Sequence, residues 1–154
     1  MCIRDSNKVV LHDEFDIYLT RYTDTLISLG DRNLLAKTLN TDVFVSLHCN
    51  ASPVVSKGIE VYVHNSDREN TKASIGLGLL ILNETTEKLG FKKRGVRFAN
   101  FQVIREAGKY PSVLVEMGFM TNTDEADYYE KPKNVRVMAL AILMGITNYL
   151  KLEL

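Results

Sequence analysis

Residues 112–117 of this chain read SVLVEM. The run follows Pro111 and is apolar at nearly every position, apart from the carboxylate of Glu116. A strand with one solvated face would alternate apolar and polar residues, and this run does not. It therefore predicts a central strand that is covered on both faces of a sheet.

Four other segments also predict strands, because they are rich in β-branched and aromatic residues or alternate apolar with polar ones. They are residues 16–20 (DIYLT), 43–48 (VFVSLH), 59–64 (IEVYVH) and 102–105 (QVIR). Helical spacing of apolar residues predicts helices at 32–39, 70–89 and 132–150, and a short helical turn at 123–129. Ser28 is the expected cap of the first helix, which would link strands 16–20 and 43–48 in a parallel βαβ unit.

Alternating strands and helices predict an α/β fold: an open, mostly parallel twisted sheet with helices on both faces, in three αβα layers. Active groups are then expected at the carboxyl ends of the strands. A length of 154 residues suits one domain. Residues 1–6 (MCIRDS) fit no periodic pattern, so we interpret them as a non-native leader or assembly scar, with the domain over 7–154.

Charge and hydropathy argue against some partners. Nineteen basic residues balance nineteen acidic ones, so no field of one sign steers the chain toward nucleic acid or an anionic membrane. The apolar run 138–146 has about half the residues of a membrane-spanning helix, and no export signal is visible. The sequence predicts no membrane span and leaves the oligomeric state open.

Two residues carry the strongest chemical signals. His48 ends a predicted strand before a polar loop, which suits either a ligand or catalytic role or a solvent-facing structural one. Glu116 lies among apolar residues, where a carboxylate is costly to bury without a partner. Either a buried ion pair with an arginine or a raised pKa that serves proton transfer would explain it.

These two segments also carry a family resemblance. Residues 44–51 (FVSLHCNA) resemble the SIHAN-A segment of zinc-dependent N-acetylmuramoyl-L-alanine amidases, and residues 113–122 (VLVEMGFMTN) resemble the LVE-GF-(S/T)N segment of the same family, amidase type 3. Shorter agreements in the same order are LTR at 19–21 with Asp24, Leu29 and Arg32, GIEVY at 58–62, and RGV at 94–96. The resemblance extends from Phe15 to Leu150.

The resemblance implies a zinc-activated water that hydrolyses the amide between N-acetylmuramic acid and L-alanine of peptidoglycan. It implies that His48 is the third zinc ligand and Glu116 the general base. The family's first two ligands are a histidine on the loop after its first strand and a glutamate from its first helix. Neither has a counterpart here, so we expect an N-terminally truncated domain. His12, Asp13 and Glu14 are not assigned as ligands. One ligand binds zinc weakly, so we expect this chain to be impaired.

Some residues receive secondary assignments. Asn50 is predicted to bind substrate or to hold its own loop, and Arg105 to reach either Glu116 or a substrate carboxylate. Cys49 is expected to be a small buried group, and Glu60 and His64 to pair at the surface.

The implied partner is peptidoglycan and the implied location is the cell envelope, periplasmic or secreted. One alternative is a non-catalytic peptidoglycan-binding or regulatory module with the same fold. The other is an unrelated cytosolic α/β protein in which Glu116 forms a salt bridge.

Overall fold

A computed structural model describes residues 15–66 and 70–152. Residues 1–6 and 12–14, which carry some of the sequence predictions, lie outside this part. Four strands form one sheet in the order β1-β4-β2-β3. Their bounds are β1 Phe44–Asn50, β2 Ile59–Val63, β3 Lys93–Phe98 and β4 Ser112–Phe119. The helices are α1 Leu29–Thr38, α2 Asn70–Leu89, α3 Gln102–Arg105, α4 Thr123–Glu130 and α5 Pro132–Leu152.

Strand β4 is the buried central strand that its apolar sequence predicted, since all eight of its residues are buried. It pairs in parallel with β1 and antiparallel with β2, and β2 pairs in parallel with β3. Two of the three pairings are therefore parallel, and helices lie on both faces. The predicted three-layer α/β architecture is confirmed.

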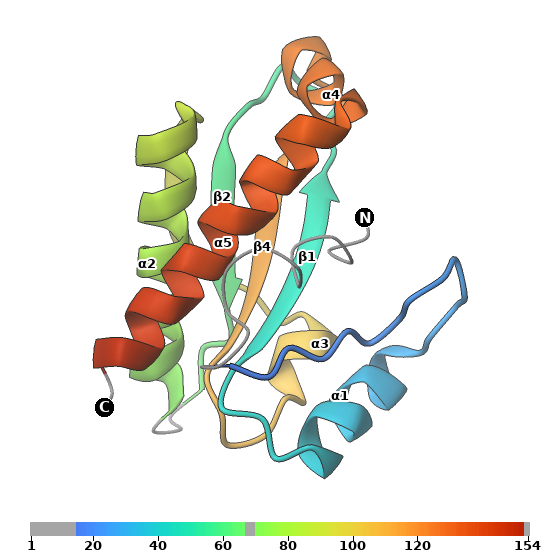
Figure 1. Cartoon of the computed structure of the whole chain (residues 1–154), viewed down its shortest axis with the longest axis vertical. Coiled ribbons are helices and arrows are strands. Elements are labelled where there is room, and N and C mark those ends of the chain that lie inside the picture. Colours follow the sequence, from blue (N-terminus) through green and yellow to red (C-terminus); the bar gives the residue numbers. More distant parts are fainter. Residues whose placement is uncertain (1–14, 67–69, 153–154) are drawn as a thin grey trace.

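The two faces of the sheet bury different clusters. Helices α2 and α5 cross one face side by side (Figure 1), and their apolar residues pack there against Val61 of β2 and Val115 of β4. Helices α2 and α5 approach closely at Gly145. A Cβ at this position would lie only 2.5 Å from the Ile81 Cα. A smaller cluster on the opposite face joins α1 and α3 to Phe44 and Leu114.

Helix α5 is the one helix in the described part of the chain that is long and apolar enough to cross a bilayer. The sequence predicted no such span. The core helix of a soluble protein meets the same two criteria, and α5 contributes Met138 and Ile142 to the larger core cluster.

Two predicted strands are wrong. Residues 16–20 form no strand, so the helix after them does not complete a βαβ unit. A segment of β-forming residues becomes a strand only if it pairs with a neighbouring strand. Among the described strands β1 pairs only with β4, so residues 16–20 have no partner in the sheet. Residues 102–105 form α3 instead of a strand, and this turn directs both Val103 and Ile104 into one cluster. Adjacent residues of a strand would face opposite ways.

Strand β3 was not predicted. Its sequence, KRGVRF, places three cations in six residues, so it lacks the apolar alternation of a half-buried strand. Edge strands of natural sheets often carry such charges, which oppose pairing with other chains.

Candidate active site

His48 and Glu116 lie on neighbouring strands in direct register, as Cα partners of the parallel β1–β4 pair. Side chains alternate along a strand, and Val115 and Met117 enter the core beneath α2 and α5. Glu116 therefore faces the opposite side of the sheet, and its register partner His48 faces that side with it. The structure thus brings the two predicted residues together, although they are 68 positions apart in the sequence.

A third residue, Glu60, completes this row. It is the Cα partner of Glu116 on the other side, in the antiparallel β2–β4 pair. Glu60 was predicted to pair with His64 at the surface, but Glu60 is only 3% exposed. The prediction was wrong because the β2–β4 register, which buries Glu60 beside Glu116, is not visible in either strand alone.

Four donors hold the Glu60 carboxylate. Oε2 accepts a hydrogen bond from Arg94 Nε at 2.9 Å and lies 3.1 Å from Arg97 Nε. Oε1 accepts from Tyr62 Oη and from Asn50 Nδ2, both at 2.9 Å. Burial alone would raise the pKa of Glu60, but these hydrogen bonds and the arginine charges lower it below its usual range. Glu60 is therefore a fixed anion.

Glu116 has the opposite electrostatic environment. Its side chain is buried, and its Oε2 has no hydrogen-bond partner within the described residues. Burial and the charge of Glu60 raise the pKa of Glu116. Within residues 15–66 and 70–152 no ion pair with an arginine involves Glu116, since Arg94 and Arg97 both bind Glu60. The sequence allowed a buried ion pair between Glu116 and an arginine. In the structure it is Glu60 that forms such ion pairs, with Arg94 and Arg97.

His48 lies at the exposed edge of the sheet, near the carboxyl end of β1. Partial burial of its ring and the nearby charge of Arg32 lower its pKa. The neutral form of the imidazole is therefore favoured over its cation, and this form has a nitrogen lone pair that can bind a cation.

The segment after His48 departs from regular pairing. The register shifts between His48 and Asn50, so that Asn50 pairs with Phe119. Asn50 Oδ1 accepts from the Ala51 N–H at 2.8 Å, and Nδ2 donates to Glu60. These bonds match the loop-holding alternative for Asn50, and a contact with substrate stays a prediction.

Cys49 is exposed, so the expectation of a buried small residue was wrong. Val45 and Leu47, which precede Cys49 on its face of β1, are only partly buried. The helices that cover this face thus shield β1 incompletely, and Cys49 lies where the register shifts.

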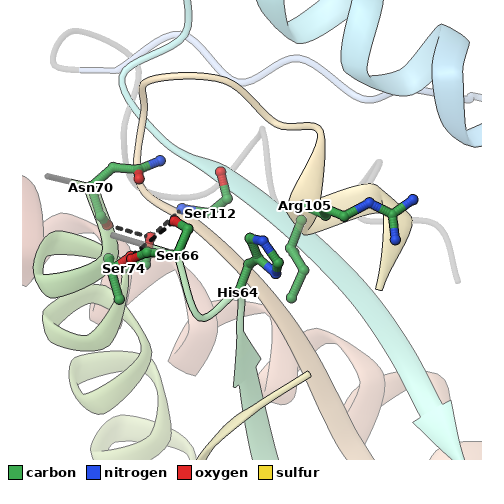
Figure 2. Close-up of a pocket in the computed structure, with 8 residues that line it drawn as sticks. His64, Ser66, Asn70, Ser74, Arg105 and Ser112 are labelled. Atoms are coloured by element: carbon green, nitrogen blue, oxygen red, sulfur yellow. Dashed lines mark hydrogen bonds between the residues drawn. The ribbon is translucent and has the colours of Figure 1, made fainter. Parts of the chain in front are cut away.

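Arg105 lies away from Glu116. Its guanidinium contacts Glu106 at 3.1 Å and the backbone and side chain of Asn100. With His64 and Ser112, Arg105 lines a small polar pocket (Figure 2). Ser112 is four residues before Glu116 on β4, or about 13 Å along a strand. Contact between Arg105 and Glu116 is therefore not formed, and its role toward a substrate carboxylate stays a prediction.

Several of the polar residues that line the pocket in Figure 2 form hydrogen bonds with one another. Ser74 Oγ donates to the Asn70 carbonyl at 2.7 Å and accepts from the Ser112 N–H at 2.9 Å. Thr71 Oγ1 donates to the Ser66 carbonyl at 2.7 Å. These bonds join the start of α2 to the segment after β2 and to the first residue of β4.

Glu125 fixes the carboxyl end of β4. Its buried carboxylate accepts the N–H groups of Phe119 and Gly58, both at 2.7 Å. Between Glu116 and this anchor, Gly118 has φ +147°, and a Cβ there would lie 3.0 Å from Glu125 Oε2. Because Gly58 leads into β2, Glu125 helps to set the register of Glu60 against Glu116.

The described residues do not form a complete zinc site. No three His, Cys, Asp or Glu side chains in residues 15–66 and 70–152 are grouped so that they could hold a metal ion. On this face of the sheet His48 is exposed, whereas Oε2 of its register partner Glu116 is buried and has no partner among the described residues.

Sequence reasoning missed the importance of Glu60, Glu125, Arg94 and Arg97. The only local signal was a carboxylate inside an apolar strand, which Glu60 shares with Glu116. The ion pairs themselves depend on pairing between β2, β3 and β4, and no segment contains that information.

The sequence of the chain is similar to a known protein family and to several of its members. The profile of the N-acetylmuramoyl-L-alanine amidase family, amidase type 3, matches residues 4–148. The amidase LytC of Bacillus subtilis is 35% identical over 133 residues, which are 85% of this chain and 26% of LytC. The endolysin of Bacillus phage SPP1 is 33% identical over 144 residues, 91% of this chain and 52% of the endolysin. The chain thus spans about half or less of these two relatives.

Solved structures agree. The catalytic domain of CwlV, an N-acetylmuramoyl-L-alanine amidase from Bacillus (Paenibacillus) polymyxa, superposes with a TM-score of 0.79 at 34% identity, covering 88% of this chain and 73% of that domain. The family profile, the relatives and the fold point the same way, and the chain belongs to the N-acetylmuramoyl-L-alanine amidase family.

Proposed function

We propose that this chain is a peptidoglycan amidase domain that cleaves the amide between N-acetylmuramic acid and L-alanine, with Glu116 as its general base. The observation that carries the proposal is the register pairing of His48 with a buried Glu116 whose Oε2 has no partner among residues 15–66 and 70–152. A desolvated carboxylate accepts a proton more readily than an exposed one near neutral pH.

In this proposal Glu116 removes a proton from the attacking water and delivers it to the departing amine of alanine. His48 supplies a neutral imidazole to a zinc ion, as the family resemblance implies. When bound, zinc would acidify the water and polarise the amide carbonyl. Since the described residues provide no three-ligand group, we expect zinc to bind weakly to them and hydrolysis to be slow.

The names of the relatives support a site of action in the cell envelope. LytC is an N-acetylmuramoyl-L-alanine amidase and the phage protein is an endolysin. We infer that the chain acts on peptidoglycan in the periplasm or outside the cell, as part of a protein that reaches the wall.

The experiment is hydrolysis of purified sacculi in the presence of added zinc, followed by labelling of newly exposed alanine amino groups. Glu116→Gln keeps the side-chain volume and removes the base, so we expect the rate to fall about 10² to 10⁴-fold. Glu87→Gln, at an exposed glutamate of α2, is the matched control. Equal rates for the wild type and Glu116→Gln would refute the role of Glu116.

A non-catalytic wall-binding module is the second candidate, and the absence of a three-ligand group among the described residues favours it. This function predicts co-sedimentation with sacculi without release of amino groups, at any zinc concentration. Zinc-dependent release that is lost in Glu116→Gln would exclude it.

A further inference from the structure

The two arginines that hold Glu60 are not equivalent. Arg94 is engaged on every side: its Nε donates to Glu60, its Nη1 donates to the Lys57 carbonyl at 3.4 Å, and its guanidinium lies 4.9 Å from the centre of the Phe119 ring. Its side chain is 23% exposed. Arg94 is therefore the structural partner of Glu60.

Among the described residues, Arg97 contacts only this same carboxylate, through Nε at 3.1 Å, and its side chain is 50% exposed. The Nε contact anchors the guanidinium on a buried anion. The two terminal nitrogens form the fork that binds carboxylates in a bidentate manner. Since one carboxylate faces two guanidinium groups, one positive charge of the cluster is not neutralised by Glu60.

This surplus charge lies on the face of the sheet that carries the proposed base. Arg97 reaches Glu60, and Glu60 is the direct cross-strand neighbour of Glu116. Neighbouring strands are about 5 Å apart, so the guanidinium lies roughly one to two strand spacings from Glu116. Tyr62, the register partner of Arg97, and Phe101 form an edge-to-face ring pair beside it, with Phe101 42% exposed.

We propose that Arg97 binds a carboxylate on the peptide side of the scissile amide and so selects acidic over amidated peptides. This inference rests on the proposed function. The only carboxyl of N-acetylmuramic acid is consumed in the scissile amide, so a free carboxylate must come from the peptide. An extended peptide advances about 3.5 Å per residue, which places a carboxylate at Arg97 one or two residues after the alanine.

The test compares two N-acetylmuramoyl-L-alanyl peptides, which differ only in a free carboxylate or a carboxamide on the residue after alanine. We expect the wild type to prefer the carboxylate in kcat/KM by about tenfold or more, as for a charge-assisted hydrogen-bonded pair. Arg97→Ala should reduce this preference to about one by weakening hydrolysis of the acidic peptide alone.

Two variants sharpen the result. Lys93→Ala removes one positive charge from the same strand, and its ammonium contacts Asn83 of α2 instead of Glu60, so the preference should persist. Arg97→Lys keeps the charge without the fork and should retain part of the preference. It also serves as the test if Arg97→Ala fails to fold.

Binding of both peptides, measured by calorimetry with the uncleaved Glu116→Gln protein and its Arg97→Ala double variant, separates this inference from the proposed function. A carboxylate preference that depends on Arg97 would support the inference even if no hydrolysis occurs. Equal binding of the two peptides, or an equal loss for both in the Arg97 variant, would overturn it and leave Arg97 as an edge-strand charge.

Discussion

Glu60 and Glu116 occupy directly opposed positions on the antiparallel strands β2 and β4, yet their carboxylates have opposite electrostatic environments. Glu60 holds two arginines, a tyrosine hydroxyl and an asparagine amide. Glu116 is buried beside it, and its Oε2 has no partner among the described residues. The pKa of Glu60 is thus lowered below that of an ordinary glutamate, while the pKa of its neighbour Glu116 is raised above it.

The pH dependence of hydrolysis should report the raised pKa of Glu116. A general base acts when deprotonated, so kcat/KM should fall as pH drops through a pKa above the ordinary glutamate value of about 4.3. Glu60→Gln removes the neighbouring negative charge and should move this acidic limb to lower pH. A limb that stays at the same pH in Glu60→Gln would contradict the proposed coupling.

The same shift affects the stability of the metal-free protein. A carboxyl whose pKa is raised on folding stabilises the fold below its unfolded pKa, and this stabilisation is lost as pH rises through the folded pKa. Glu116→Gln should therefore raise Tm at pH 7 and have little effect at pH 4. Melting curves in chelator at both pH values check this, and a lower Tm at pH 7 would count against it.

Glu60→Gln should destabilise the fold by about 1 to 3 kcal/mol, because it leaves two partly buried guanidinium groups without their counter-charge. The pKa of Glu60 is lowered on folding, so its contribution is present above the unfolded pKa and disappears as pH falls through the folded one. Urea unfolding of wild type and variant should diverge at pH 7 and converge in acid. Parallel curves at every pH would exclude this ion-pair role.

Gly118→Ala should cost about 1 to 3 kcal/mol of unfolding free energy, since φ +147° disfavours any side chain and the new Cβ would meet a carboxylate fixed by two N–H groups. Gly76→Ala is the matched control. Gly76 lies within α2, and its new Cβ would lie 3.6 Å from the Tyr149 ring of α5, which is ordinary contact. The substitution should therefore be neutral or slightly stabilising. Similar denaturation midpoints for the two variants would show that Glu125 does not constrain this site.

Zinc retention measures the completeness of the metal site. With His48 as the proposed ligand and no three-ligand group among the described residues, we expect less than one zinc per chain after dialysis, as measured by elemental analysis. His48→Ala should lower the remaining zinc further. One tightly held zinc that His48→Ala leaves unchanged would disprove the assignment of His48.

Local patterns were sufficient for several elements. The unbroken apolar run of β4 identified a central strand, and helical spacing identified α2 and α5 almost to their ends. His48 and Glu116 were selected from their segments alone, because a polar residue at a strand end and a carboxylate in an apolar run are local anomalies. Residues 16–20 and 102–105 were misassigned because short apolar runs do not reveal whether a strand partner exists or whether adjacent side chains share a cluster.

Tertiary structure decided everything that depends on register. Only the alignment of β1, β4 and β2 places His48, Glu116 and Glu60 in one row, and only the β2–β3 pairing brings Arg97 to Glu60. Side-chain periodicity is a property of one segment, whereas register is set by packing and by anchors such as Glu125 that join distant segments. The sequence therefore identified the candidate chemical groups. Their pKa shifts and their partners depend on which strands pair and in which register.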